Sequence, residues 1–122
     1  MATIDILKIS IIEELEGALS EEKNKRYKNA LILYSKAMFS LCDYIIAINK
    51  LKLPSDHKER FEILDRYFPA IYRIVRKVFG KYIDTYIKPS DKEGCERMKN
   101  AIREIEDIGK INSEIKEVIK KL

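Results

Sequence analysis

The stretch YKNALILYSKAMFSLCDYIIAINKL, residues 27–51, decides the fold of this chain. Its apolar residues recur at steps of three and four, the spacing that places side chains on one face of an α-helix. We therefore expect one continuous helix with a broad stripe that must be buried. The stripe consists of Tyr27, Ala30, Leu31, Tyr34, Ala37, Met38, Leu41, Tyr44, Ile45 and Ile48.

A second apolar row lies on another side of the same predicted helix. Ile32, Phe39 and Ile46 follow one another at intervals of seven residues, which is close to two helical turns. A helix that is apolar on two sides lies at the centre of a bundle, or between its own bundle and a partner. These three residues are therefore the candidate interface of a homodimer.

Length and composition are those of one folded domain, residues 1–122. A chain of 122 residues can bury a core without the support of metals or disulfides. Charged residues make up 36% and apolar residues 46%, which is typical of a folded protein. Scarce Gly and Pro and abundant Ile, Leu, Lys and Glu favour helices and resemble the composition of thermophile proteins.

The rest of the chain predicts further helices before and after the central one. The predicted fold is an all-α, antiparallel up-and-down bundle of four to five helices with a short extra C-terminal helix. Polar residues, prolines and Gly109 separate the segments. The expected ranges are 3–22, 27–51, 56–68, 70–86 and 91–108, followed by a short helix within 113–122.

Capping residues locate the starts of the third and fifth predicted helices. Ser55 and Asp56 are both suitable N-caps for the third helix. Ser90 and Glu93 match a capping box, in which each side chain accepts from the other residue's backbone N–H, and they predict the start of the fifth helix.

The end of the chain leaves two interpretations open. Gly109 predicts the end of the fifth helix, and Asn112 or Ser113 can cap a separate last helix. The alternative is that the tail continues the fifth helix. On the inner stripes of the fourth and fifth helices we expect Tyr86 and Ile108, respectively.

Charge and cysteine content exclude several classes of protein. The net charge of +4 comes from 24 basic and 20 acidic residues, far from the block basicity of a nonspecific nucleic-acid binder. Cys42 and Cys95 show no CxxC spacing and have no nearby His, so we expect two buried thiols, no metal site and no cofactor.

The amino terminus does not match a signal peptide. Asp5, Lys8, Glu13 and Glu14 interrupt its apolar residues, and a basic first region and a small-residue cleavage site are missing. We also expect no apolar run long enough to span a membrane. The prediction is a cytoplasmic protein without a membrane partner.

The candidate binding residues are basic and lie on two segments. Arg73, Arg76 and Lys77 share one side of the fourth predicted helix, where they could contact successive phosphates. A solvated helix face shows the same pattern, so both interpretations stay open. His57 and Arg60, near the start of the third helix, complete the candidate phosphate-binding set. His57 could equally be a solvated or capping residue.

Common catalytic motifs are absent from the sequence. It contains no GxxxxGK[ST], GxGxxG, HExxH or GxSxG. No catalytic residue and no metal ligand are therefore predicted from motifs.

The order of features over about residues 7–110 resembles the HEPN family of small helical-bundle domains. An R-Y-x-x-A motif at Arg26, Tyr27 and Ala30 opens the long helix, and the loop KLPSDH ends at His57. The final helix is entered through Asp84, Tyr86, Ser90 and Glu93. The resemblance implies a helical bundle that forms homodimers. Relatives cleave RNA, act in toxin–antitoxin pairs with minimal nucleotidyltransferases, or are proposed to bind nucleotides.

The chain departs from the nuclease-type members of that family. These members carry an Arg followed about four to six residues later by a His, whereas the nearest Arg before His57 is Arg26. We therefore predict a noncatalytic HEPN-like homodimer that acts as a nucleotide-binding or protein-interaction module. The alternatives are an RNA-processing enzyme or toxin that uses His57, Arg60, Arg73 and Arg76, and an antitoxin-like partner of a nucleotidyltransferase.

Overall fold

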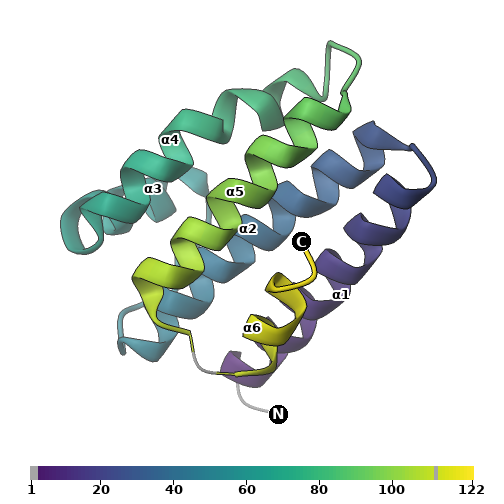
Figure 1. Cartoon of the computed structure of the whole chain (residues 1–122). Coiled ribbons are helices and arrows are strands. Elements are labelled where there is room, and N and C mark those ends of the chain that lie inside the picture. Colours follow the sequence, from purple (N-terminus) through teal and green to yellow (C-terminus); the bar gives the residue numbers. More distant parts are fainter. Residues whose placement is uncertain (1–2, 112) are drawn as a thin grey trace.

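The computed structural model describes residues 3–111 and 113–122, and these form helices and connecting loops without a strand (Figure 1). The all-α fold class is therefore confirmed. The helices are α1 (Thr3–Lys23), α2 (Tyr27–Ile48), α3 (His57–Tyr67), α4 (Pro69–Asp84), α5 (Lys92–Gly109) and α6 (Glu114–Ile119).

Helix α2 is the central element, and it contacts α1, α4 and α5 (Figure 1). Its predicted stripe is buried from Ala30 to Ile45, which confirms the burial prediction; Tyr27 is half-buried and Ile48 is exposed at the two ends. The helix ends at Ile48, three residues before the predicted limit. The chain leaves the helical path there because Lys50 has a left-handed backbone, with φ of 61°.

The second apolar row of α2 is covered by its own chain. Ile46 is fully buried and Phe39 is 6% exposed, while Ile32 is half-buried. The Phe39 ring lies 4.5 Å from the His57 ring of α3 and 5.4 Å from the Tyr82 ring of α4, measured between centroids. Phe39 and Ile46 are therefore buried within the single chain, with α3 and α4 covering Phe39, and the homodimer interface predicted for this row stays a prediction.

Helix α2 is also long and apolar enough to cross a membrane by length and composition alone. This differs from the expectation that no apolar run reaches that length. Most of the stretch is buried inside the bundle, as in the core helix of a helical protein.

Two aspartates cap the third and fifth helices. The Asp56 carboxylate accepts from the Glu59 backbone N–H at 2.8 Å, which selects Asp56 over Ser55 as the cap of α3. At α5 the cap is Asp91, which accepts from the Gly94 N–H at 2.8 Å. The predicted capping box at Ser90 is one residue too early, because the extended backbone that a cap requires occurs at Asp91.

Helices α5 and α6 are separate elements, and Ser113 caps α6 by accepting from the Ile115 N–H at 3.3 Å. Asn112, the other predicted cap, lies outside the described residues. Helix α5 ends at Gly109 as predicted, but the left-handed residue is Lys110, with φ of 52°. Gly109 serves close packing instead, since a Cβ there would lie 2.6 Å from Cδ1 of Ile45 on α2.

Two residues predicted on inner stripes are exposed. Tyr86 is 69% exposed, because α4 ends at Asp84 and Tyr86 lies beyond it. Ile108 is 42% exposed and lies in the last turn of α5, beside α4.

Candidate functional site

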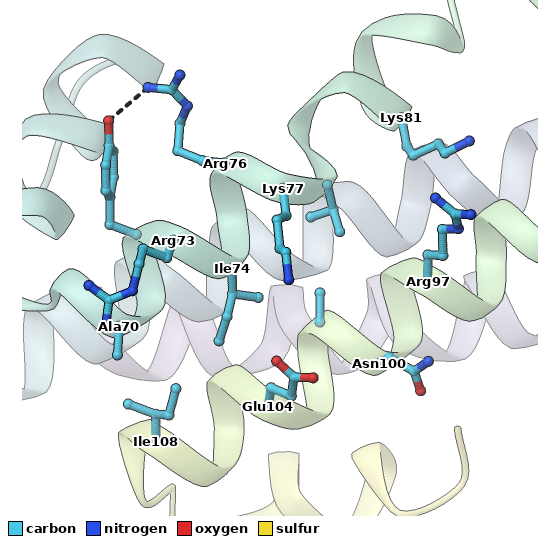
Figure 2. Close-up of a pocket in the computed structure, with 13 residues that line it drawn as sticks. Ala70, Arg73, Ile74, Arg76, Lys77, Lys81, Arg97, Asn100, Glu104 and Ile108 are labelled. Atoms are coloured by element: carbon cyan, nitrogen blue, oxygen red, sulfur yellow. Dashed lines mark hydrogen bonds between the residues drawn. The ribbon is translucent and has the colours of Figure 1, made fainter.

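An open groove of about 1260 Å³ runs between α4 and α5 (Figure 2). Helix α4 is amphipathic: Pro69 occupies its first turn, and Ile71, Val75 and Val78 anchor it to the core. Residues of α4 outside this buried face line a surface channel between α4 and α5. From α4 the groove is lined by Ala70, Tyr72, Arg73, Ile74, Arg76, Lys77, Val78 and Lys81, and from α5 by Arg97, Asn100, Ala101, Glu104 and Ile108.

The α4 wall carries a row of cations at Arg73, Lys77 and Lys81. Successive members are four residues apart, which corresponds to about 6 Å along the helix axis. Figure 2 shows Lys77 directed toward α5, with Lys81 and Arg97 farther along the channel. The positive charges are thus spread along the groove rather than gathered at one point.

The cations of this row have no acidic partner in the described part of the chain. No carboxylate there lies within ion-pair distance of Arg73, Lys77 or Lys81. The other two cations of the groove are engaged: Arg97 pairs with Glu93 at 2.7 Å, and Arg76 donates to the Tyr72 hydroxyl at 2.7 Å (Figure 2). The positive charges of Arg73, Lys77 and Lys81 are therefore available to pair with a bound anion.

The α5 wall has a different character. Asn100 and Glu104 are exposed polar residues one turn apart, and Ile108 follows in the next turn. Ala70, Ile74 and Ile108 gather at one end of the groove and make it apolar (Figure 2). One wall is basic, and the other is polar and partly apolar. A ligand that carries anionic groups together with polar and apolar groups would match both walls.

The other predicted binding residues, His57 and Arg60, belong to a separate cluster. Arg60 donates through Nε and Nη2 to the two oxygens of Asp43 on α2, at 2.8 and 2.9 Å. Its Nη1 lies 2.8 Å from Nδ1 of His57. Arginine has only donors, so Nδ1 accepts and the imidazole is neutral with its proton on Nε2.

Aromatic rings surround His57 and connect three helices. Its ring centroid lies 4.5 Å from that of Phe39 on α2 and 5.5 Å from that of Phe79 on α4. Burial lowers the pKa of His57, and the positive charge of Arg60 lowers it further. The structure thus divides the predicted phosphate-binding set, because Arg73, Arg76 and Lys77 line the groove whereas His57 and Arg60 join α3 to α2.

A smaller hollow of about 420 Å³ lies near the end of α1, beside the first turns of α5. At its base the buried Lys99 ammonium lies 3.0 Å from Glu22 and 2.7 Å from Glu96. The Tyr34 hydroxyl donates to Glu22 at 2.7 Å. These groups satisfy one another, so the network joins α1, α2 and α5 rather than offering a free charge.

The cysteines are structural thiols. Cys42 and Cys95 are both free and buried, as predicted. Burial raises the pKa of Cys42 to about 12 and that of Cys95 to about 11. Neither is a reactive thiolate near neutral pH. Among the residues that the structure describes, no group of three or more potential ligands is placed to hold a metal.

Four polar groove residues lie outside the predicted binding set. Lys81 belongs to the same basic face of α4 as the predicted residues, and Arg97, Asn100 and Glu104 come from α5. The spacing of three and four residues places the latter three on one outer stripe of the fifth helix, which a helical projection of the sequence reveals. Only the tertiary structure shows that this stripe lies next to the basic face of α4.

Comparison with protein-family models, with curated proteins and with solved structures finds no match to this chain. The resemblance to the HEPN family therefore stays a prediction from the sequence motifs alone.

Proposed function

We propose that this protein is a noncatalytic binding module whose α4–α5 groove holds a phosphate-bearing ligand, either a nucleotide or a nucleic-acid strand. The observation that carries the proposal is the row of Arg73, Lys77 and Lys81, without an acidic partner in the described residues. Cations placed along a groove attract polyanions and raise their association rate.

The distribution of charge supports this proposal. The groove has five basic residues and one carboxylate, an excess as large as the net charge of +4 of the whole chain. Elsewhere opposite charges balance. Because the cations of the row are about 6 Å apart along the helix, a ligand with several phosphates in an extended arrangement can pair with more of them at once than a single phosphate can.

The position of the only histidine supports a role in binding rather than in RNA cleavage. A general base must lie within hydrogen-bond reach of the proton that it removes. His57 does not line the groove, and its Nδ1 already accepts from Arg60. The alternative of an RNA-processing enzyme would need this cluster to open.

The test is fluorescence anisotropy with a labelled single-stranded RNA of about 12 nucleotides, a length within the range that small single-strand binding folds cover. The variant Arg73→Ala/Lys77→Ala/Lys81→Ala should bind this RNA much more weakly. The salt dependence of binding should also decrease by about one counterion for each phosphate that the variant no longer neutralises.

A matched control removes three lysines outside the groove, Lys28→Ala/Lys36→Ala/Lys121→Ala, and keeps the same change in net charge. This control should retain most of the affinity. An equal decrease in both triple variants would show that net charge, not the groove, attracts the ligand. Absence of binding to RNA, to DNA and to nucleoside triphosphates by the unaltered protein would refute the proposal.

Membership of the HEPN family and a homodimer remain part of the proposal. The exposed apolar side chains that could support such a dimer lie at Ile6 and Ile9 of α1 and at Ile83, Tyr86 and Ile87. A dimer stabilised by an apolar interface should persist at about tens of micromolar. Analytical ultracentrifugation that finds a monomer at this concentration would remove the dimer from the proposal.

A further inference from the structure

One carboxylate, Glu104, lies in the wall opposite the cation row. Figure 2 shows it on α5, on the side of this helix that lines the channel. It forms no ion pair within the described residues, although five cations line the same groove. Its carboxylate oxygens are therefore available to a ligand in the groove.

We infer that Glu104 is a specificity-determining residue, which makes the groove select a ligand with base amino groups beside its phosphates and reject a plain polyphosphate. The inference rests on the proposed function, because it assumes that the groove holds a phosphate-bearing ligand. It adds the chemical class of that ligand and the orientation in which it lies.

The charge of Glu104 determines where phosphates can lie in the groove. An ionised carboxylate only accepts hydrogen bonds, and it repels a phosphate placed next to it. Phosphates therefore lie against Arg73, Lys77 and Lys81 on the α4 wall, away from Glu104. Whatever the ligand presents to the α5 wall must be uncharged or must donate hydrogen bonds.

The hydrogen-bonding groups of the α5 wall match the edge of a base. Cytosine and adenine carry an exocyclic amino group that a carboxylate can accept from, whereas the corresponding position of uracil is an acceptor. Asn100, one turn before Glu104, already accepts from Arg103 through Oδ1, which leaves its amide protons as donors. The α5 wall thus offers an acceptor and a donor side by side, as recognition of a base edge requires.

The apolar end of the groove favours a planar group over bare phosphates. Ile74 and Ile108 lie on opposite walls there, and Ile108 is 42% exposed. A planar base can cover these side chains and remove them from water, which a chain of bare phosphates cannot do. A ligand with its phosphates on α4 and its base on α5 would therefore form favourable contacts with both walls.

The experiment compares oligocytidine and oligouridine of about 12 nucleotides, a length typical of single-strand binding sites, because the two strands have equal charge. Inorganic polyphosphate of similar length is the third probe. The unaltered protein should prefer oligocytidine over oligouridine by roughly threefold or more, because uracil presents the O4 acceptor where cytosine presents its amino group, and uracil has only its single N3–H to donate. Oligocytidine should also bind more tightly than polyphosphate.

The variant Glu104→Gln removes the negative charge and keeps the size of the side chain. It should bind polyphosphate roughly two- to fivefold more tightly, as expected for removal of one exposed like charge. It should also lose the preference for oligocytidine, because the amide of Gln can donate to uracil as well as accept from cytosine. The control Glu13→Gln makes the same charge change on the exposed face of α1 and should leave the preference intact.

The outcomes separate the two proposals. If Glu104→Gln changes the affinity for all three probes by the same factor, or if the unaltered protein shows no preference between the two strands, the inference about Glu104 is overturned while the binding groove stands. If the unaltered protein binds none of the three probes and also fails to bind DNA and nucleoside triphosphates, the proposed function fails and the inference fails with it.

Discussion

His57 makes the stability of this protein dependent on pH. Its Nδ1 must stay unprotonated to accept from Arg60, which itself holds Asp43. Burial first, and Arg60 second, lower the pKa of His57 below its ordinary value of 6.5, although Asp43 and Asp56 oppose the shift. The unfolded chain therefore binds a proton at a higher pH than the folded chain does.

The direction of this pKa shift determines how the stability should change with pH. The contribution of His57 to stability is fully present above about pH 6.5, decreases as the pH falls below that value, and is lost below the pKa of the folded state. Urea unfolding at a series of pH values between about 7 and 5 measures it. The variant His57→Gln keeps an acceptor for Arg60 but does not titrate in this range, so its stability should vary less. Parallel profiles of the two proteins would exclude His57 as the titrating group.

Three lysines occupy backbone positions that glycine normally fills. Lys25, Lys50 and Lys110 have φ values of 61°, 61° and 52°. Each follows a helix and closes the same motif, in which the N–H of the next residue reaches back five residues, as from Ile111 to the Glu106 carbonyl. A left-handed conformation costs a residue with a Cβ about 1–2 kcal/mol.

Replacing any of these lysines by glycine should stabilise the protein. The gain should be about 0.5–1 kcal/mol in the free energy of unfolding, since relief of backbone strain exceeds the entropy that glycine adds to the unfolded chain. Lys110→Ala is the control, because alanine removes the charge but keeps the Cβ. Thermal or urea unfolding that finds Lys110→Gly no more stable than Lys110→Ala would contradict this explanation.

At the scale of elements, α3 is the helix with the fewest apolar anchors. Leu64 is its only fully buried residue among those described, whereas α2 buries most of its length. It is connected to α2 by the contact of His57 with Phe39 and by the pair of Arg60 and Asp43, whose side chains are only 12% and 15% exposed. A polar pair of this kind is costly to break, because the remaining charge stays largely buried.

The variant Asp43→Ala should therefore loosen α3 selectively. Removal of one partner from a buried pair costs about 3–5 kcal/mol, with the lower end expected here because both groups keep some exposure. Hydrogen exchange should accelerate in residues 57–67 more than in α1. The double variant Asp43→Leu/Arg60→Leu should recover much of the stability. A uniform increase of exchange over the whole chain would show that α3 does not open separately.

At the scale of the whole molecule, α2 illustrates how one chain can cover both sides of an apolar helix. Helix α1 contacts it along much of its length, and α5 lies beside it (Figure 1). Aromatic rings of α3 and α4 pack against Phe39 on a further side. The core is therefore a single cluster centred on α2. Burial of Phe39 stabilises the folded chain and does not require a second subunit.

Phe39→Ala tests this directly. Truncating a buried phenylalanine should lower the free energy of unfolding by about 3–5 kcal/mol. The sedimentation coefficient should stay the same as that of the unaltered protein at equal concentration, because the ring is covered within one chain. A variant that keeps its unfolding free energy but shifts from dimer to monomer would instead place Phe39 at a subunit interface.

The sequence by itself determined the fold class, the buried stripe of α2, the start of α3 at a cap of Ser55 or Asp56, the break at Pro69 and the burial of both cysteines. These features depend on residues that are close in sequence, where helical periodicity, capping geometry and proline sterics act. Errors at this level were small, such as the cap at Asp91 instead of Ser90.

Only the tertiary structure decided which surfaces of the helices meet. In the structure, α3 and α4 pack against Phe39, and Arg60 forms an ion pair with Asp43. The stripe of Arg97, Asn100 and Glu104 on α5 lies across the groove from the cations of α4. Periodicity identifies the face on which a side chain lies, but not the neighbour of that face, because the neighbour depends on how distant helices pack and share one core. For this reason the sequence predicted the basic residues of the α4 wall but not the α5 wall of the candidate groove.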